Sequence, residues 1–141
     1  HETFSKITLH SQTVLTPHPG EAAEMLQTTV KEIQKNRIKS SKELQKKYGC
    51  IIVLKGNGTI VCDKNHVYLC SSGGPELAVA GSGDVLSGVI GSLMAQGLSP
   101  INAAITSVGI HAQAGEEFAK DVGKIGLAAG ELIPYIRKFL N

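Results

Sequence analysis

The feature that most constrains the fold is a continuous apolar run, Ile51–Leu54, which is followed at once by Lys55 and a glycine turn. A strand with apolar side chains on both faces is typical of a parallel sheet covered by helices on both sides. Three further strand-like segments occur at 13–17, 59–63 and 66–70. Helical patterns precede and follow these strands, so the order of elements predicts an α/β fold. A sheet of about four strands is thin for this class, and we expect further strands from outside this sequence.

Five helical segments are expected, at 21–27, 29–49, 84–97, 101–121 and 128–140. The second is predicted as one amphipathic helix. Its expected inner face comprises Val30, Ile33, Ile38, Leu44 and Tyr48. Lysines and arginines recur between 31 and 47, but no aromatic residues interleave with them as they do in single-strand nucleic-acid sites. We therefore interpret these charges as a solvated outer face.

Composition excludes several classes of partner. The length of 141 residues fits one domain, and a net charge of only +2 gives no strong attraction to nucleic acid or to a membrane surface. No apolar run reaches the ~18 residues that a membrane span needs. Cys50, Cys62 and Cys70 have no metal-binding or redox spacing. An odd, scattered set of thiols indicates a reducing compartment, and we expect a cytoplasmic protein with inert, buried cysteines.

The glycine-rich stretch Gly81–Asp84 (Gly-Ser-Gly-Asp) stands directly before an apolar helical segment. The first N–H groups of a helix attract anions, and the glycines leave room for a phosphate to approach the backbone. Two interpretations of Asp84 are open. It is an N-cap of the helix, or it is a general base beside an anion hole formed by the amides of Gly81, Ser82 and Gly83.

A second glycine turn, Lys55–Thr59, follows the buried strand. Ligands of open α/β sheets bind beyond the carboxyl ends of the strands, and lysine is a point-charge partner for phosphate. The Gly-Lys-Ser/Thr string of a P-loop is missing. The turn is therefore either a phosphate-binding loop of another type or a tight hairpin with an exposed lysine.

His18 lies between two prolines, after another strand end. The rigid loop predicts either a preorganised ligand wall or a turn with an exposed histidine. Glu21 either caps the next helix or orients His18. His111, among small apolar residues of a predicted helix, is interpreted as a hydrogen-bonded core histidine.

In their order along the chain, these stretches resemble the C-terminal half of the ADP/ATP-dependent NAD(P)H-hydrate dehydratases, which belong to the ribokinase-like superfamily. The order is TPHPGE, VLKGNGT, GSGDVLSGVIGSLMAQGLSP, GIHAQAGEEFA and LIPYIRKFL. The superfamily at large shares the Gly-x-Gly-Asp element. The proline-flanked His18 and the Lys-Gly-x-x-Thr string narrow the resemblance to the dehydratase branch.

The resemblance implies a ribokinase-like three-layer sandwich and a repair reaction. ATP or ADP, with Mg²⁺, phosphorylates the ring hydroxyl of hydrated NADH or NADPH, and loss of phosphate restores the reduced cofactor. By position, Asp84 matches the base and a substrate contact, and His18 matches a second substrate contact. The anion hole corresponds to Gly81, Ser82 and Gly83, and the nucleotide site corresponds to Lys55, Gly56, Asn57, Gly58, Thr59 and Gly83. No protein metal ligand is implied.

The chain departs from the family in two respects. Many members carry Gly-Gly-Met-Gly-Asp where this chain has Ala80-Gly81-Ser82-Gly83-Asp84. The family domain is also about twice as long. We therefore expect residues 1–141 to form the C-terminal portion of a ribokinase-like domain, catalytically incomplete without the other half. It is expected to pair with that half or to form a homo-oligomer through an exposed sheet edge.

Two alternatives remain. The chain belongs to another ribokinase-like small-molecule kinase, acting for example on a hydroxymethyl-pyrimidine or a sugar, or it is a truncated fragment that only binds nucleotide or assembles.

Overall fold

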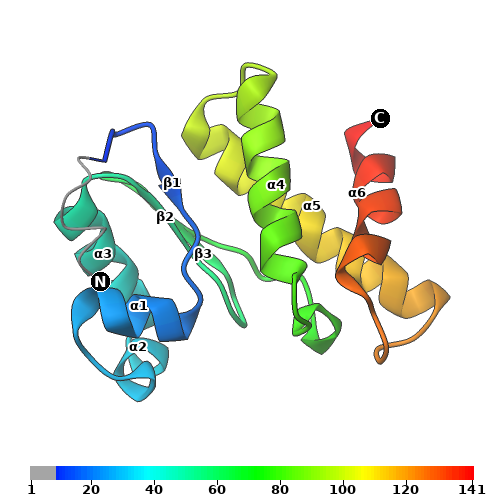
Figure 1. Cartoon of the computed structure of the whole chain (residues 1–141), viewed down its shortest axis with the longest axis horizontal. Helices are drawn as coiled ribbons and strands as arrows, with labels where there is room; N and C mark the ends of the chain where they lie inside the picture. The colour runs from blue at the N-terminus through cyan, green and yellow to red at the C-terminus, as the bar shows by residue number, and fades with distance from the viewer. Residues whose placement is uncertain (1–8) are drawn as a thin grey trace.

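The structure, a computed structural model, describes residues 9–141 and has three layers (Figure 1). A four-stranded sheet in the order β1-β2-β3-β4 lies between α1–α3 on one face and α4 and α5 on the other, with α6 packed beside α5. The strands are β1 (Val14–Leu15), β2 (Ile51–Leu54), β3 (Ile60–Cys62) and β4 (Val67–Leu69). The helices are α1 (Pro19–Leu26), α2 (Val30–Lys35), α3 (Arg37–Tyr48), α4 (Ser82–Ala95), α5 (Pro100–Asp121) and α6 (Leu132–Leu140). The predicted α/β fold with helices on both faces of the sheet is confirmed.

The sheet is mixed. β1 pairs with β2 in parallel, and β2, β3 and β4 follow one another as antiparallel hairpins. Because parallel strands end at the same edge of a sheet, the segments after β1 and β2 lie side by side. A hydrogen bond fixes this arrangement, with the Lys55 N–H donating to the Pro17 carbonyl at 2.9 Å.

Each face of β2 belongs to a different hydrophobic core, as its apolar run predicts. Ile52 and Leu54 pack among α1–α3, and Ile51 and Val53 pack against α4 and α5. All four side chains are buried. A third cluster, around Phe118, joins α5 to α6. The alternation of side chains along β2 therefore holds the three layers together.

The prediction of one helix over 29–49 is wrong. The segment forms two helices, α2 and α3, which meet at Asn36. Because the chain changes direction there, the predicted inner face is split. Ile33 is fully buried, whereas Ile38 is 52% exposed and Val30 is 47% exposed.

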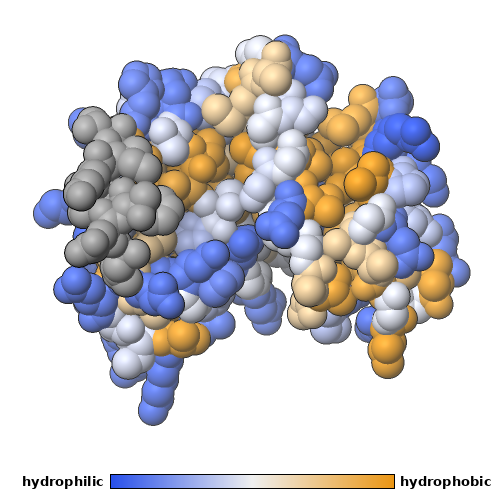
Figure 2. Space-filling model, viewed as in Figure 1, coloured by the Kyte–Doolittle hydropathy of each residue, from blue (hydrophilic) through white to orange (hydrophobic). Residues whose placement is uncertain are grey.

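Within residues 9–141, β1 and β4 stand at the two ends of the strand order. Both residues of β1 are only half-buried, and β4 is half-buried to exposed. Figure 2 shows apolar surface on both sides of α4, toward β1 and toward α6. Among residues 9–141, no helix has the length and apolarity to cross a membrane.

The break at Asn36 predicts opposite outcomes for two isoleucines. Ile33→Ala should lower the free energy of unfolding by about 2–5 kcal/mol, because it leaves a cavity in the core. The matched control Ile38→Ala should change it by less than about 1 kcal/mol, because that side chain is half in water. Urea denaturation measures both, and equal losses would contradict the two-helix arrangement.

Candidate functional site

Three segments meet at the edge of the sheet where β1 and β2 end (Figure 1). The Thr16 hydroxyl lies 3.0 Å from that of Ser87, which links the end of β1 to α4. The side chain of Lys55, at the end of β2, rests on Gly83 in the first turn of α4. The structure therefore brings together the loops that follow two parallel strands and the start of α4.

Gly83 allows the close approach of Lys55. A Cβ atom built on Gly83 would lie 2.7 Å from the Lys55 Nζ, closer than real Cβ contacts. Any side chain at position 83 would therefore displace the ammonium group. The lysine ammonium and the positive end of the helix thus lie side by side, an arrangement that favours binding of an anion beside both of them.

Asp84 is not an N-cap, so that interpretation is wrong. α4 begins at Ser82, its N-cap is Gly81, and Asp84 is the third residue of the helix. The side chain is exposed, and its carboxylate has no hydrogen bond or ion pair with any residue in the described range 9–141. The carboxylate is therefore available to a ligand.

Two of the three amides of the predicted anion hole are open. The N–H groups of Gly81 and Gly83 donate to no residue of the described chain, whereas the Ser82 N–H donates to the Val79 carbonyl at 3.3 Å. Gly81 has a φ of 83°, a conformation that glycine adopts without strain. The start of α4 thus offers Gly81 and Gly83 as backbone donors, whereas the Ser82 amide is engaged and its buried hydroxyl lies 3.2 Å from the His111 Nε2.

His111, on α5, is a buried, hydrogen-bonded histidine, as predicted. Its Nε2 lies 3.1 Å from the Ser82 carbonyl and 3.2 Å from the Ser82 hydroxyl. Burial lowers the pKa of His111, and the hydrogen bond to the Ser82 backbone opposes this shift. The imidazole is therefore neutral at neutral pH, and its Nε2–H donates to the Ser82 carbonyl. Sequence reasoning missed that this contact ties α5 to the start of α4.

His18 is the N-cap of α1. Its Nδ1 accepts hydrogen bonds from the amides of Gly20 and Glu21, and the Glu21 carboxylate accepts from the His18 N–H at 2.6 Å. This reciprocal pair is a capping box, so Glu21 caps the helix. The Nε2 of His18 lies on a side chain that is 57% exposed, and no contact joins it to Asp84 within residues 9–141. The predicted substrate contact of His18 remains a prediction.

The Lys55–Thr59 segment is the turn of the β2–β3 hairpin. Gly56 and Gly58 have φ values of 133° and 68°, and the Thr59 hydroxyl donates to the Gly56 carbonyl at 3.2 Å. The four amides of residues 56–59 donate to no described residue. The segment is thus a tight hairpin that also presents several unpaired N–H groups beside Lys55.

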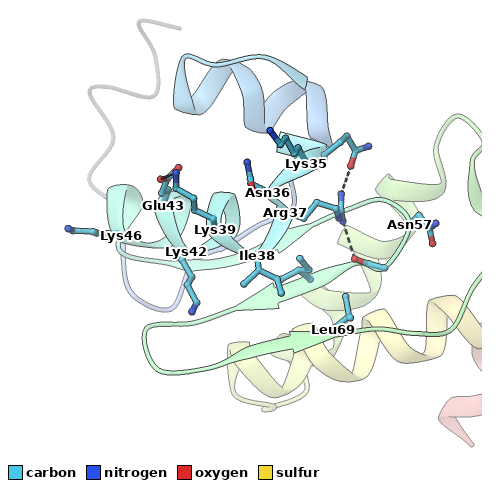
Figure 3. Close-up of a pocket in the computed structure, with 13 residues that line it drawn as sticks. Lys35, Asn36, Arg37, Ile38, Lys39, Lys42, Glu43, Lys46, Asn57 and Leu69 are labelled. Atoms are coloured by element: carbon cyan, nitrogen blue, oxygen red, sulfur yellow. Dashed lines mark hydrogen bonds and ion pairs between the residues drawn. The ribbon is translucent and has the colours of Figure 1, made fainter. Parts of the chain in front are cut away.

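An open groove of about 970 Å³ lies on the other side of this loop, along α3 (Figure 3). Asn57 and Gly58 line it, but Lys55, Gly83 and Asp84 do not. Figure 3 also shows Arg37 reaching the loop from α3, a contact that sequence reasoning missed. Recognition of the helix break at Asn36 would have placed Arg37 at the start of a separate helix, but the pattern of apolar residues does not reveal this break.

No group of three metal-ligating side chains occurs in the part of the chain that the structure describes. Carboxylates are the usual protein ligands of Mg²⁺, and the Asp84 carboxylate lies in the first turn of α4.

Comparison with known proteins identifies the family. A sequence profile of the NAD(P)H-hydrate dehydratases matches residues 2–138, nearly the whole chain. The chain belongs to this family. The members that resemble it include the bifunctional NAD(P)H-hydrate repair enzyme of Coxiella burnetii, 43% identical over 129 residues. The ADP-dependent (S)-NAD(P)H-hydrate dehydratase of Neisseria meningitidis is 42% identical over 130 residues. Both matches cover 91% of this chain.

This family member spans only part of those relatives, 26% of the first and 44% of the second. The same holds for solved structures. The ADP/ATP-dependent NAD(P)H-hydrate dehydratase of Bacillus subtilis, crystallised with ATP and Mg²⁺, superposes with a TM-score of 0.86 at 32% identity. That match covers 90% of this chain and 47% of the other. A ribokinase-like protein of Enterococcus faecalis, 25% identical, has a TM-score of 0.79, so the ribokinase-like fold is confirmed.

The neutral His111 predicts a dependence of stability on pH. The unfolded chain takes up a proton near pH 6.5, the ordinary value for histidine, and the folded form resists it because burial lowers the pKa. Stability should therefore decline as the pH falls below about 6.5 toward the lowered pKa of the folded form. His111→Gln, which keeps a donor for the Ser82 carbonyl, should show a shallower decline.

Melting temperatures of wild type and His111→Gln across this pH range test the prediction. His66→Gln, a change at an exposed histidine, is the matched control and should follow the wild type. Parallel curves for wild type and His111→Gln would show that His111 does not carry the effect.

Proposed function

We propose that this chain is the nucleotide-binding and catalytic portion of an ADP/ATP-dependent NAD(P)H-hydrate dehydratase. The observation that carries the proposal is the placement of Lys55 against Gly83, next to an unpaired Asp84 carboxylate. A cation, open amides and a free carboxylate at the start of one helix are the groups that phosphoryl transfer requires. Family membership supports the hydrated cofactor as the proposed substrate class.

In this proposal Asp84 removes the proton from the ring hydroxyl of hydrated NADH or NADPH. The oxygen attacks the terminal phosphorus of ATP or ADP, and the bond to the rest of the nucleotide breaks. The carbon–oxygen bond of the phosphorylated ring then breaks, and phosphate leaves with the electron pair. The adjacent ring carbon then loses a proton to solvent water, and the electron pair of that C–H bond restores the double bond.

The residues of this chain hold the phosphates. Lys55 supplies the point charge, and the open amides of Gly81 and Gly83 face the charge that develops during transfer. The unpaired amides of residues 56–59 extend this donor set along the nucleotide. Mg²⁺, carried by the nucleotide, would offset the remaining negative charge. His18 is proposed to contact the substrate through its exposed side chain, whose Nε2 lies 3.6 Å from a carboxylate oxygen of Glu21.

Two observations bear on what completes the site. Among residues 9–141, β1 stands at one end of the strand order, and the chain covers 47% of the B. subtilis enzyme. We propose that the N-terminal half of the domain pairs with β1 and completes the pocket, whether it belongs to the same polypeptide or to another. A second copy of this chain is the alternative occupant of that edge. The free thiols of Cys50, Cys62 and Cys70 are consistent with the cytoplasm as the compartment.

The role of Asp84 is tested in the complete enzyme. Asp84→Asn should lower kcat by about 10²–10⁴-fold, because the general base is lost, and should leave the Kd for ATP or ADP nearly unchanged. Recovery of NADH absorbance and release of phosphate measure turnover, and calorimetry measures binding. Asp121→Asn, at an exposed position on α5, is the control. A near-normal rate for Asp84→Asn would exclude the base, and a stable phosphorylated product in the wild type would indicate a kinase instead.

The missing wall gives a separate prediction. This chain alone should show no measurable turnover of hydrated NADH, and adding the N-terminal half of the domain should restore it. Recovery of NADH absorbance with each half and with both measures this. Full activity of the 141-residue chain by itself would refute the partial-site proposal.

A further inference from the structure

Arg37, the first residue of α3, turns toward the β2–β3 hairpin (Figure 3). Its guanidinium donates to the carbonyl oxygens of Leu54 at 3.2 Å, Lys55 at 3.3 Å and Gly58 at 3.0 Å. Gln34 holds the other end of the fork, with its Oε1 2.9 Å from Nη1. The guanidinium therefore fills the inner side of the loop and joins both of its arms.

The contacts of Arg37 fix the direction of the peptide groups in this loop. In a trans peptide the C=O and the following N–H point in opposite directions, and the described chain has no cis peptide bond. Leu54 shows the effect directly. Its carbonyl faces Arg37, and the next N–H, that of Lys55, points the other way and donates to the Pro17 carbonyl at 2.9 Å.

The same geometry applies at two further peptide groups. The carbonyls of Lys55 and Gly58 face Arg37, so the N–H groups of Gly56 and Thr59 point away from it. Neither N–H donates to a residue within 9–141. Glycine at position 56 lets the guanidinium come close, since a Cβ there would lie 2.9 Å from Nη1.

Arg37 also supplies charge behind the loop. It forms no ion pair with a carboxylate in the part of the chain that the structure describes, and the half-buried guanidinium keeps its full positive charge. A cation on the carbonyl side of a loop whose amides point outward raises the potential on the amide side.

We propose that Arg37 is a positioning residue of the nucleotide loop. By holding the carbonyls of Lys55 and Gly58 inward, it directs the amides of Gly56 and Thr59 toward the phosphates of the bound nucleotide. This inference rests on the proposed function, because it assigns the loop of residues 55–59 to the nucleotide. A purely structural role, closure of the hairpin, would instead weaken the whole site without preference for one substrate.

The experiment compares Arg37→Gln, Arg37→Lys and the control Lys39→Gln, each introduced into the full-length natural protein. Arg37→Gln should raise the KM and Kd for ATP or ADP about tenfold, because two oriented donors and a charge are lost. The KM for the hydrated cofactor should stay within about twofold of the wild type. Arg37→Lys keeps the charge but not the forked guanidinium, so its nucleotide KM and Kd should lie between those of the wild type and those of Arg37→Gln. Lys39→Gln removes the same charge from an exposed site on α3 and should match the wild type.

A second measurement needs no variant and covers the case in which Arg37→Gln does not fold. Addition of ADP to the ¹⁵N-labelled wild type should shift the amide resonances of Gly56 and Thr59. Unshifted amides, or an unchanged nucleotide Kd in Arg37→Gln, would overturn the inference. So would an equal rise in both KM values.

Failure of the inference and failure of the proposed function give different results. If the wild type restores NADH and Arg37→Gln keeps its affinity for the nucleotide, only the proposed role of Arg37 is overturned. Wild type that binds neither ATP nor ADP overturns both proposals. Nucleotide binding that depends on Arg37, without restoration of NADH, supports the inference and overturns the dehydratase assignment.

Discussion

The hydrogen bond from the Lys55 N–H to the Pro17 carbonyl is the constraint on which the site depends. It joins the ends of two parallel strands that lie far apart in the sequence, and it sets where Lys55 leaves the sheet. From that point the side chain reaches Gly83, on the opposite layer of the molecule. The parallel pairing of β1 and β2 thus brings the segments that follow them together with the start of α4 at one edge of the sheet.

Two side chains, one arginine and one histidine, hold the loops at this edge in place from the helical layers on either side. Arg37 holds the loop after β2 from the α1–α3 layer, and His111 holds Ser82 from α5. Each donates from a buried or half-buried side chain to backbone carbonyls, so each orders a segment in which some amides, such as those of Gly56 and Gly83, donate to no residue of the described chain. The open amides are available to an anion because other groups already fix their backbone.

The fold was largely predictable, since the signals for it are local. The apolar run at 51–54 required cover on both faces, and the strands and most helices lie where their patterns place them. The prediction of one helix over 29–49 was wrong because both α2 and α3 carry apolar residues at helical spacing. The change of direction at Asn36 follows from how these helices pack against the sheet, which the spacing does not record. The inward contact of Arg37 was not predicted for the same reason, since this residue begins α3 directly after the break.

The sequence by itself indicated the family and predicted a phosphate site, because glycines, a lysine and an aspartate occur in it in a characteristic order. It also indicated that the glycines of this stretch leave room for a phosphate near the backbone. The tertiary structure alone decided which of these groups meet. It made His18 a helix cap, left the carboxylate of Asp84 without a partner among residues 9–141, and turned one arginine of a basic helix inward. The reason is that hydrogen-bond partners across layers depend on how helices pack on the sheet, which no local pattern records.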